Sequence, residues 1–231
     1  MIGVDEILKI LRESDSYAAA QLIELDGSAE EIGKRYSEVS KALYWEKKDV
    51  TAAILIGRFG ISYCLGRAND AEMELSERLR GVAKGMAFNL ASFAWRGWDE
   101  NGVTITAADE AAGCDAAKLN LRLAVELKKD AKPMMNAHWM VGAYWVAEGK
   151  AEEAFAAFDA ARRFAEQARD ASAEGMCRAY AILARLTRDS SVEGEFTEAL
   201  ASLRKIESKD AGFYVEQLKT ARRVFCVSSG S

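Results

Sequence analysis

The chain has 231 residues, of which 50% are hydrophobic and 29% charged, with one proline and a formal net charge of −5. This composition is typical of a folded globular protein and argues against a disordered chain. The negative charge argues against binding of nucleic acid over a broad surface, because phosphate contacts need a basic field.

No targeting or membrane segment is evident. Residues 1–8 lack the basic start and the unbroken apolar run of a signal peptide. The most apolar stretch, residues 52–65, is short and contains Arg58, so no membrane span is expected. We therefore expect a cytoplasmic protein. The four cysteines are widely separated and form no C-x-x-C pair, which favours buried thiols over a zinc or redox site.

The chain begins with signals for short helices. Residues 4–13 form one predicted helix, and residues 17–25 form a second after a Ser-Asp-Ser cap. Ser28 followed three residues later by Glu31 is a capping box for a third helix, which should run to the neighbourhood of residue 46.

Two glycines interrupt the next predicted helix, residues 50–66, which Asp49 caps. Gly57 and Gly60 cost helix stability relative to alanine. The compensation that we expect is the close approach of a neighbouring helix at both glycines. A long helix is predicted to follow over residues 71–96.

The helical pattern is broken once, at residues 97–106. Thr106 with Asp109 then resembles a capping box, with Asp in place of the usual Glu, for a helix that runs to Lys129. Because long irregular insertions in compact folds often carry function, a ligand pocket near Trp98 is one possibility.

The clearest pattern lies in residues 136–168. Apolar residues recur at three- and four-residue spacing on both sides of Gly149, which supplies a permissive backbone where the first helix stops. The pattern predicts two antiparallel helices with small residues at their contact and Phe158 filling the gap between them.

This hairpin resembles the tetratricopeptide repeat, whose signature is W-x2-L-G-x2-Y followed by A-x3-F. Its small residues let the two helices pack closely. The chain departs from the signature at its first position, where it has a histidine, and has no closing proline. The matching positions hold His138, Val141, Gly142, Trp145, Ala154 and Phe158.

Fainter copies of the hairpin pattern occur on both sides of it. The resemblance therefore implies one all-α domain over residues 1–231, a right-handed α-solenoid of stacked antiparallel helix hairpins with about ten to eleven helices. The last helices are predicted at residues 171–188, 196–207 and 211–225. Within the domain we expect N-terminal short helices at 1–27, core hairpins at 28–168, a C-terminal hairpin and capping helix at 169–226, and a tail at 227–231.

The resemblance also implies a binding site. In this family, first-helix residues line a concave groove that holds an extended peptide or a partner helix. Aromatic and methionine side chains there would anchor a partner, although core packing is the alternative for each of them. The aligned positions are Phe88, Asn89, Ser92, Trp95 and Arg96 in one hairpin and Trp139, Met140, Ala143, Val146 and Ala147 in the next, and Asn136 is a further candidate.

Three arginines lie near one face of the helix predicted at residues 171–188. Arg178, Arg185 and Arg188 could meet an anionic ligand. Solvation, or pairing with Glu174 and nearby acids, is the simpler interpretation. Arg178 and Arg185 are kept as candidate partner-binding residues.

No motif in the sequence predicts catalysis. His138 is the only histidine, so a two-histidine metal site within one chain is impossible, and a packed structural histidine is favoured. Phosphate-binding glycine loops are also missing from the sequence. We therefore expect a non-enzymatic interaction module without a cofactor, which binds a protein or peptide and neither nucleic acid nor membrane. The alternatives are a small-molecule sensor or enzyme with a pocket near residues 97–106, and a structural homo-oligomer such as a homodimer.

Overall fold

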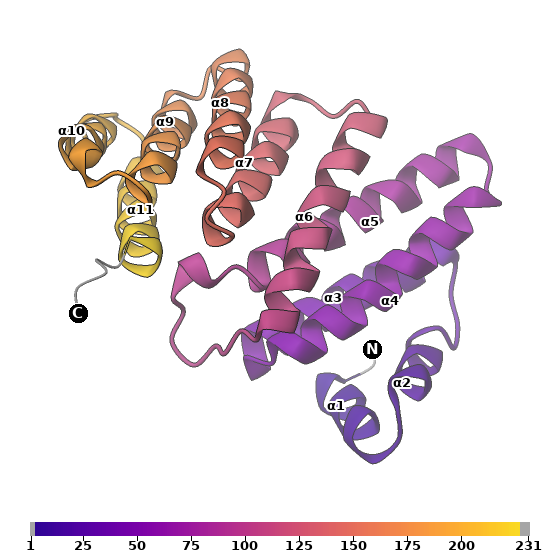
Figure 1. Cartoon of the computed structure of the whole chain (residues 1–231). Helices are drawn as coiled ribbons and strands as arrows, with labels where there is room; N and C mark the ends of the chain where they lie inside the picture. Colours follow the sequence, from indigo (N-terminus) through magenta and orange to yellow (C-terminus); the bar gives the residue numbers. More distant parts are fainter. Residues whose placement is uncertain (1–2, 227–231) are drawn as a thin grey trace. The chain divides into compact units, whose positions relative to one another are not determined.

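The computed structural model describes residues 3–226, and each regular element among them is a helix (Figure 1). This confirms the all-α prediction. The tail predicted at residues 227–231 lies outside the described residues. The helices are α1 (Val4–Glu13), α2 (Ser16–Ile23), α3 (Ala29–Lys47), α4 (Val50–Asn69), α5 (Met73–Phe93), η1 (Arg96–Trp98), α6 (Ala107–Glu126), α7 (Ala131–Ala147), α8 (Ala151–Gln167), α9 (Ala171–Leu186), η2 (Ser190–Val192), α10 (Glu193–Arg204) and α11 (Ala211–Phe225).

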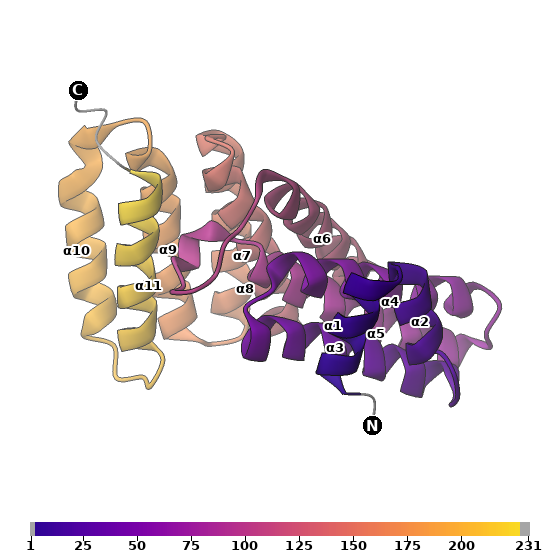
Figure 2. The ribbon, with the colours of Figure 1, turned by 90° about the horizontal axis from the view of Figure 1, so that it is seen from below.

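The chain divides into two compact units, in each of which consecutive helices pack against one another. Unit 1 contains α1 to α5 together with α6, and α3, α4, α5 and α6 pack in chain order. Unit 2 contains α7 to α11 and also the short η1 segment, residues 95–101, which comes from between α5 and α6. Figure 2 shows α9, α10 and α11 packed together within unit 2. One continuous solenoid over the whole chain stays a prediction.

Local capping explains where several helices begin. The Ser28 hydroxyl accepts a hydrogen bond from the Glu31 N–H, and the Ser28 N–H donates to Glu31 Oε2 at 2.8 Å. The predicted capping box is therefore confirmed. Asp49 likewise accepts from the Ala52 N–H at 2.9 Å and starts α4.

The prediction for α5 was wrong at both ends. The helix begins at Met73, two residues later than expected, and Glu72 in front of it makes no side-chain cap. It stops at Phe93 because Trp95 has an extended backbone (φ −89°, ψ 109°), which leads the chain into unit 2. The indole of Trp95 is fully buried there, and this burial is a tertiary effect that helical periodicity does not report.

Close helix packing at the α4 glycines is confirmed. A Cβ atom built on Gly57 would lie 2.6 Å from Cδ2 of Leu90, and one on Gly60 would lie 2.5 Å from Cβ of Tyr36. No real Cβ contact is that short, so α3 and α5 approach α4 where a side chain is missing.

The central hairpin also has the predicted form. Gly149 has a φ of +69° at the turn between α7 and α8, which a residue with a side chain rarely adopts. A Cβ atom on Gly142 would lie 2.8 Å from Cε1 of Phe158, whose ring is fully buried between the two helices. The hairpin of the resemblance is thus present, while the family itself and the handedness of the array stay predictions.

Three cysteines are buried and Cys226 is half-buried, and all four are free thiols. Burial raises the pKa of the Cys64 thiol to about 11, so it behaves as a small apolar side chain at neutral pH. Within residues 3–226, no helix has both the length and the apolarity needed to cross a bilayer.

Candidate partner-binding groove

Three of the side chains expected to line a groove, Trp95, Trp139 and Met140, lie instead in the core of unit 2. Trp95 and Met140 are fully buried, and Trp139 exposes only 5% of its surface. Their side chains therefore offer almost no area to a partner in this structure. The apolar stripe that predicted a binding face is a packing face, because helical periodicity cannot tell whether another segment covers it.

The covering segment is η1 with its flanking residues. The Trp95 indole N–H donates to the carbonyl oxygen of Ala143 at 3.1 Å, and the Trp95 ring lies 5.6 Å from that of Trp139. The ring centroid of Phe225, at the end of α11, lies 5.9 Å from that of Trp95. Residues 95–101 therefore occupy the surface of α7 that the alignment assigned to a ligand.

Two buried polar atoms in this cluster are unsatisfied. The indole N–H of Trp139 and the hydroxyl of Tyr180 have no hydrogen-bond partner among residues 3–226, although their rings lie 5.4 Å apart. Burial also raises the pKa of the Tyr180 hydroxyl far above its ordinary value, so it remains protonated. Orphaned buried groups of this kind are rare and are commonly satisfied by an ordered water or a ligand.

The other predicted residues are spread over both units. Phe88, Asn89 and Ser92 are half-buried on α5 of unit 1, whereas Asn136 is half-buried on α7 of unit 2. Their role in binding stays a prediction.

The three arginines of α9 have different surroundings. Arg188 donates to the carbonyl oxygen of Gly149 at 2.6 Å, and Arg185 pairs with Glu195 at 2.9 Å. Arg178 is exposed and makes no ion pair within residues 3–226. Of the three, Arg178 is therefore the one whose guanidinium remains available to a ligand.

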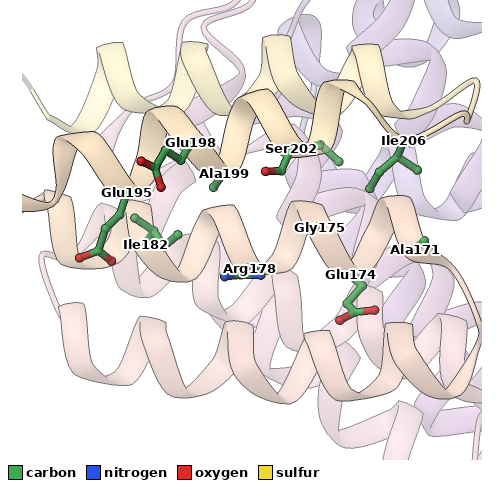
Figure 3. A pocket seen from close by; sticks show the side chains of 11 residues that line it. Ala171, Glu174, Gly175, Arg178, Ile182, Glu195, Glu198, Ala199, Ser202 and Ile206 are labelled. Carbon is green, nitrogen blue, oxygen red and sulfur yellow. The ribbon is translucent and has the colours of Figure 1, made fainter.

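Arg178 lies in a groove of about 420 Å³ between α9 and α10 (Figure 3). Its lining combines apolar side chains, small residues and charged groups. The α9 side contributes Ala171, Glu174, Gly175, Arg178 and Ile182, and the α10 side contributes Glu195, Glu198, Ala199, Ser202, Leu203 and Ile206. Each set recurs at three- and four-residue spacing, so each forms one stripe along its helix.

Small residues line both helices of the groove, Gly175 on α9 and Ala199 and Ser202 on α10. Phe196 and Leu203 are buried and fix α10 to the core of unit 2. Opposite Leu203 is Gly175, where a Cβ atom would lie 3.1 Å from Cδ1 of the leucine. Ala199 and Ser202, one turn apart, then leave space above this contact.

Asp170 is the N-cap of α9, the helix that carries Glu174, Arg178 and Ile182. Its carboxylate accepts hydrogen bonds from the Ala173 N–H at 3.0 Å and from the Ser172 hydroxyl at 2.8 Å. Burial alone would raise the pKa of Asp170, but these hydrogen bonds outweigh it and hold the pKa below its ordinary value. The Asp170 carboxylate is therefore charged at neutral pH, and its negative charge interacts favourably with the dipole of α9.

The rim of the groove carries three carboxylates and one guanidinium. Glu195 is already paired with Arg185, a contact between exposed groups that contributes little to stability. Glu174 lies 3.9 Å from a nitrogen of Arg162, at the limit of an ion pair. Glu198 is exposed and makes no ion pair with another described residue, so the rim has a net negative charge.

A smaller groove of about 220 Å³ lies in unit 1, between α4, α5 and α6. Its charged lining residues are Arg58 and Asp115. None of the predicted partner-binding residues lines it, and it is half the size of the α9/α10 groove.

No cluster of metal-binding side chains is found in the described part of the chain. Among residues 3–226, no group of three or more His, Cys, Asp or Glu side chains is placed to hold a metal ion. His138 is half-buried and stacks on the ring of Phe164, with ring centroids 5.5 Å apart. Burial lowers the pKa of its imidazole, as expected for a packed neutral histidine.

Comparison of the chain with protein-family models, with curated proteins and with solved structures finds no match. The tetratricopeptide resemblance therefore rests on the hairpin pattern, and function is inferred from the residues of the chain and their geometry.

Proposed function

We propose that this protein is a non-enzymatic interaction module of stacked helix pairs, of the tetratricopeptide type and located in the cytoplasm. It binds a helical segment of a partner protein in the α9/α10 groove. The observation that supports this proposal most directly is an open groove between two helices of opposite direction, with an apolar floor and a charged rim (Figure 3).

The dimensions of the groove suit a helix. The α9 stripe extends from Ala171 to Ile182 and the α10 stripe from Glu195 to Ile206. At 1.5 Å per residue each stripe is roughly 16 Å long, which corresponds to about three helical turns. Amphipathic helices commonly bind in such grooves through apolar residues spaced three and four apart.

A selection experiment tests this function. Wild-type protein and two variants would be screened against a displayed library of helical peptides. Ala199→Arg places a long side chain in the groove, whereas Ala156→Arg makes the same change at an exposed position of α8 that does not line it. We expect wild type and Ala156→Arg to enrich the same peptides and Ala199→Arg to lose them. Failure of wild type to enrich any peptide, or retention of the same peptides by Ala199→Arg, would contradict the proposal.

A small polar ligand in the aromatic core is a second candidate function, because the Trp139 indole and the Tyr180 hydroxyl are unsatisfied near Trp98. An ordered water would satisfy the same atoms. Mass spectrometry of the native protein and of its denatured extract distinguishes the two, since only a ligand leaves a released small molecule. A homodimer stays an untested alternative, but its interface would have to use side chains other than the buried Trp139.

A further inference from the structure

We infer that the helix bound in the α9/α10 groove carries charges in the order basic, acidic, basic along the side that faces the rim. This inference rests on the proposed function and specifies the chemistry of the partner. It follows from the order in which the charged groups lie along the groove.

The rim has its charges in an alternating order. Glu195 and Glu198 lie toward one end of the groove, Arg178 lies near its middle, and Glu174 lies toward the other end (Figure 3). Glu174 and Arg178 are four residues apart on α9 and therefore one turn apart on one face.

These groups have capacity left for a partner. Within residues 3–226, neither Arg178 nor Glu198 takes part in an ion pair, and the contact of Glu174 with Arg162 is 3.9 Å long. A guanidinium offers five N–H donors in a fixed fork and prefers a carboxylate. A carboxylate such as that of Glu198 accepts hydrogen bonds from a lysine or arginine side chain. A partner that satisfies all three must therefore alternate in sign.

Simpler ligands fit the rim less well. A free anion such as phosphate would be attracted by Arg178 but repelled by Glu174 and Glu198 on either side of it. A uniformly basic helix would place one of its charges against Arg178. Like charges in contact disfavour the wrong partner, so the alternating rim selects against both.

The apolar floor sets the rest of the partner's surface. Ile182 and Ile206 lie toward opposite ends of the groove (Figure 3), and the buried Leu203 packs against Gly175. A helix whose apolar stripe enters the groove buries the half-exposed Ile182 and Ile206, while its alternating charges lie beside the stripe and reach the rim. Apolar burial then supplies affinity, and the charges supply register and specificity.

Three synthetic peptides test the inference by fluorescence anisotropy. All are amphipathic helices of about 12 residues with the same apolar stripe. One carries Lys, Glu and Lys at four-residue spacing, one carries Glu, Lys and Glu, and one carries three Lys. The first two contain the same number of opposite-charge pairs one turn apart, so their intrinsic helicity is matched.

We expect the Lys-Glu-Lys peptide to bind about tenfold more tightly than the Glu-Lys-Glu peptide, and more tightly than the three-Lys peptide. The preference should fall as salt is raised. A protein with the three charges exchanged, Glu174→Lys, Arg178→Glu and Glu198→Lys, should reverse it. These side chains are exposed or half-buried, so we expect the exchange to leave the fold intact.

Each other outcome overturns the inference. Equal binding of all peptides, a preference of wild type for the Glu-Lys-Glu or three-Lys peptide, or an exchanged protein that keeps the wild-type preference would show that the rim does not read charge order. Failure of every peptide to bind would also overturn it. The proposed function is decided separately, because the display selection with Ala199→Arg does not depend on charge order.

Discussion

Gly142 shows how one missing side chain sets the distance between two helices. The ring of Phe158 occupies the space in which a Cβ atom would otherwise lie, so α7 and α8 pack around a contact between backbone and ring. This detail was predictable from sequence, because a glycine within an apolar helical stripe needs a packing reason. The partner ring was predictable too, since it stands at the position where the repeat signature has Phe.

Gly142→Ala is expected to destabilise the protein by about 1–3 kcal/mol, because the new methyl group overlaps the Phe158 ring. Gly85→Ala is the matched control. Gly85 lies in the interior of α5, is exposed, and has nothing within 4 Å of an added Cβ atom, so alanine should stabilise the helix by about 1 kcal/mol. Urea unfolding followed by circular dichroism measures both. Changes of the same sign in the two variants would contradict the packing assignment.

The single histidine gives a pH prediction that other imidazoles cannot obscure. Burial lowers the pKa of His138 in the folded protein, so protonation favours the unfolded chain. The free energy of unfolding should therefore decline as pH falls from about 7.5 to about 5.5, through the ordinary histidine pKa near 6.5. An NMR titration of the imidazole measures the folded pKa directly, and His138→Gln should remove this part of the decline. A folded pKa at or above the ordinary value would refute the prediction.

At the scale of elements, the sequence predicted what depends on neighbours in the chain. Capping boxes and the turn at Gly149 involve residues at most a few positions apart, and they are found where expected. The end of α5 was missed because a distant part of the chain buries Trp95. For the same reason the sequence could not separate the core face of Trp139 from a binding face, and it found Arg178 but not the groove around it.

The cap of α6 should contribute more than an exposed cap. Asp109 is 4% exposed, accepts from the N–H and hydroxyl of Thr106, and also accepts from the Thr51 hydroxyl of α4 at 3.1 Å. Asp109→Ala is therefore expected to cost about 1–2 kcal/mol, since it removes one half of the capping box and the hydrogen bond from Thr51.

Glu31→Ala is the control for Asp109→Ala, because Glu31 holds the same position in an exposed capping box. Its cost should be about 1 kcal/mol or less. Thermal and urea unfolding of the two variants give the comparison. Equal losses would show that the contact with Thr51 adds nothing.

At the scale of the whole molecule, the two units are not two consecutive stretches of the sequence. The chain leaves unit 1 after α5, contributes residues 95–101 to unit 2, and returns to unit 1 at Gly102. Trp95 is the centre of that contribution, with rings of α7, α9 and α11 around it. A single cut between the units would therefore remove a piece of the core of unit 2.

Trp95→Ala should destabilise unit 2 by about 3–5 kcal/mol, the range for large aromatic residues deleted from cores. Hydrogen exchange followed by mass spectrometry should show lost protection in α7, α9 and α11, with protection in α3 and α4 retained. Trp45→Ala is the control, because Trp45 is 59% exposed on α3. Unchanged protection in unit 2, or an equal loss in α3 and α4, would contradict the assignment of residues 95–101 to that unit.

The central claim is that a partner helix binds between α9 and α10. The most direct test is methyl NMR of the protein labelled at isoleucine, titrated with a helical peptide selected on wild type. We predict that the methyl signals of Ile182 and Ile206 shift, while those of Ile54 and Ile61 in unit 1 stay unchanged. Binding that shifts the unit 1 signals and leaves Ile182 and Ile206 unmoved would contradict the claim.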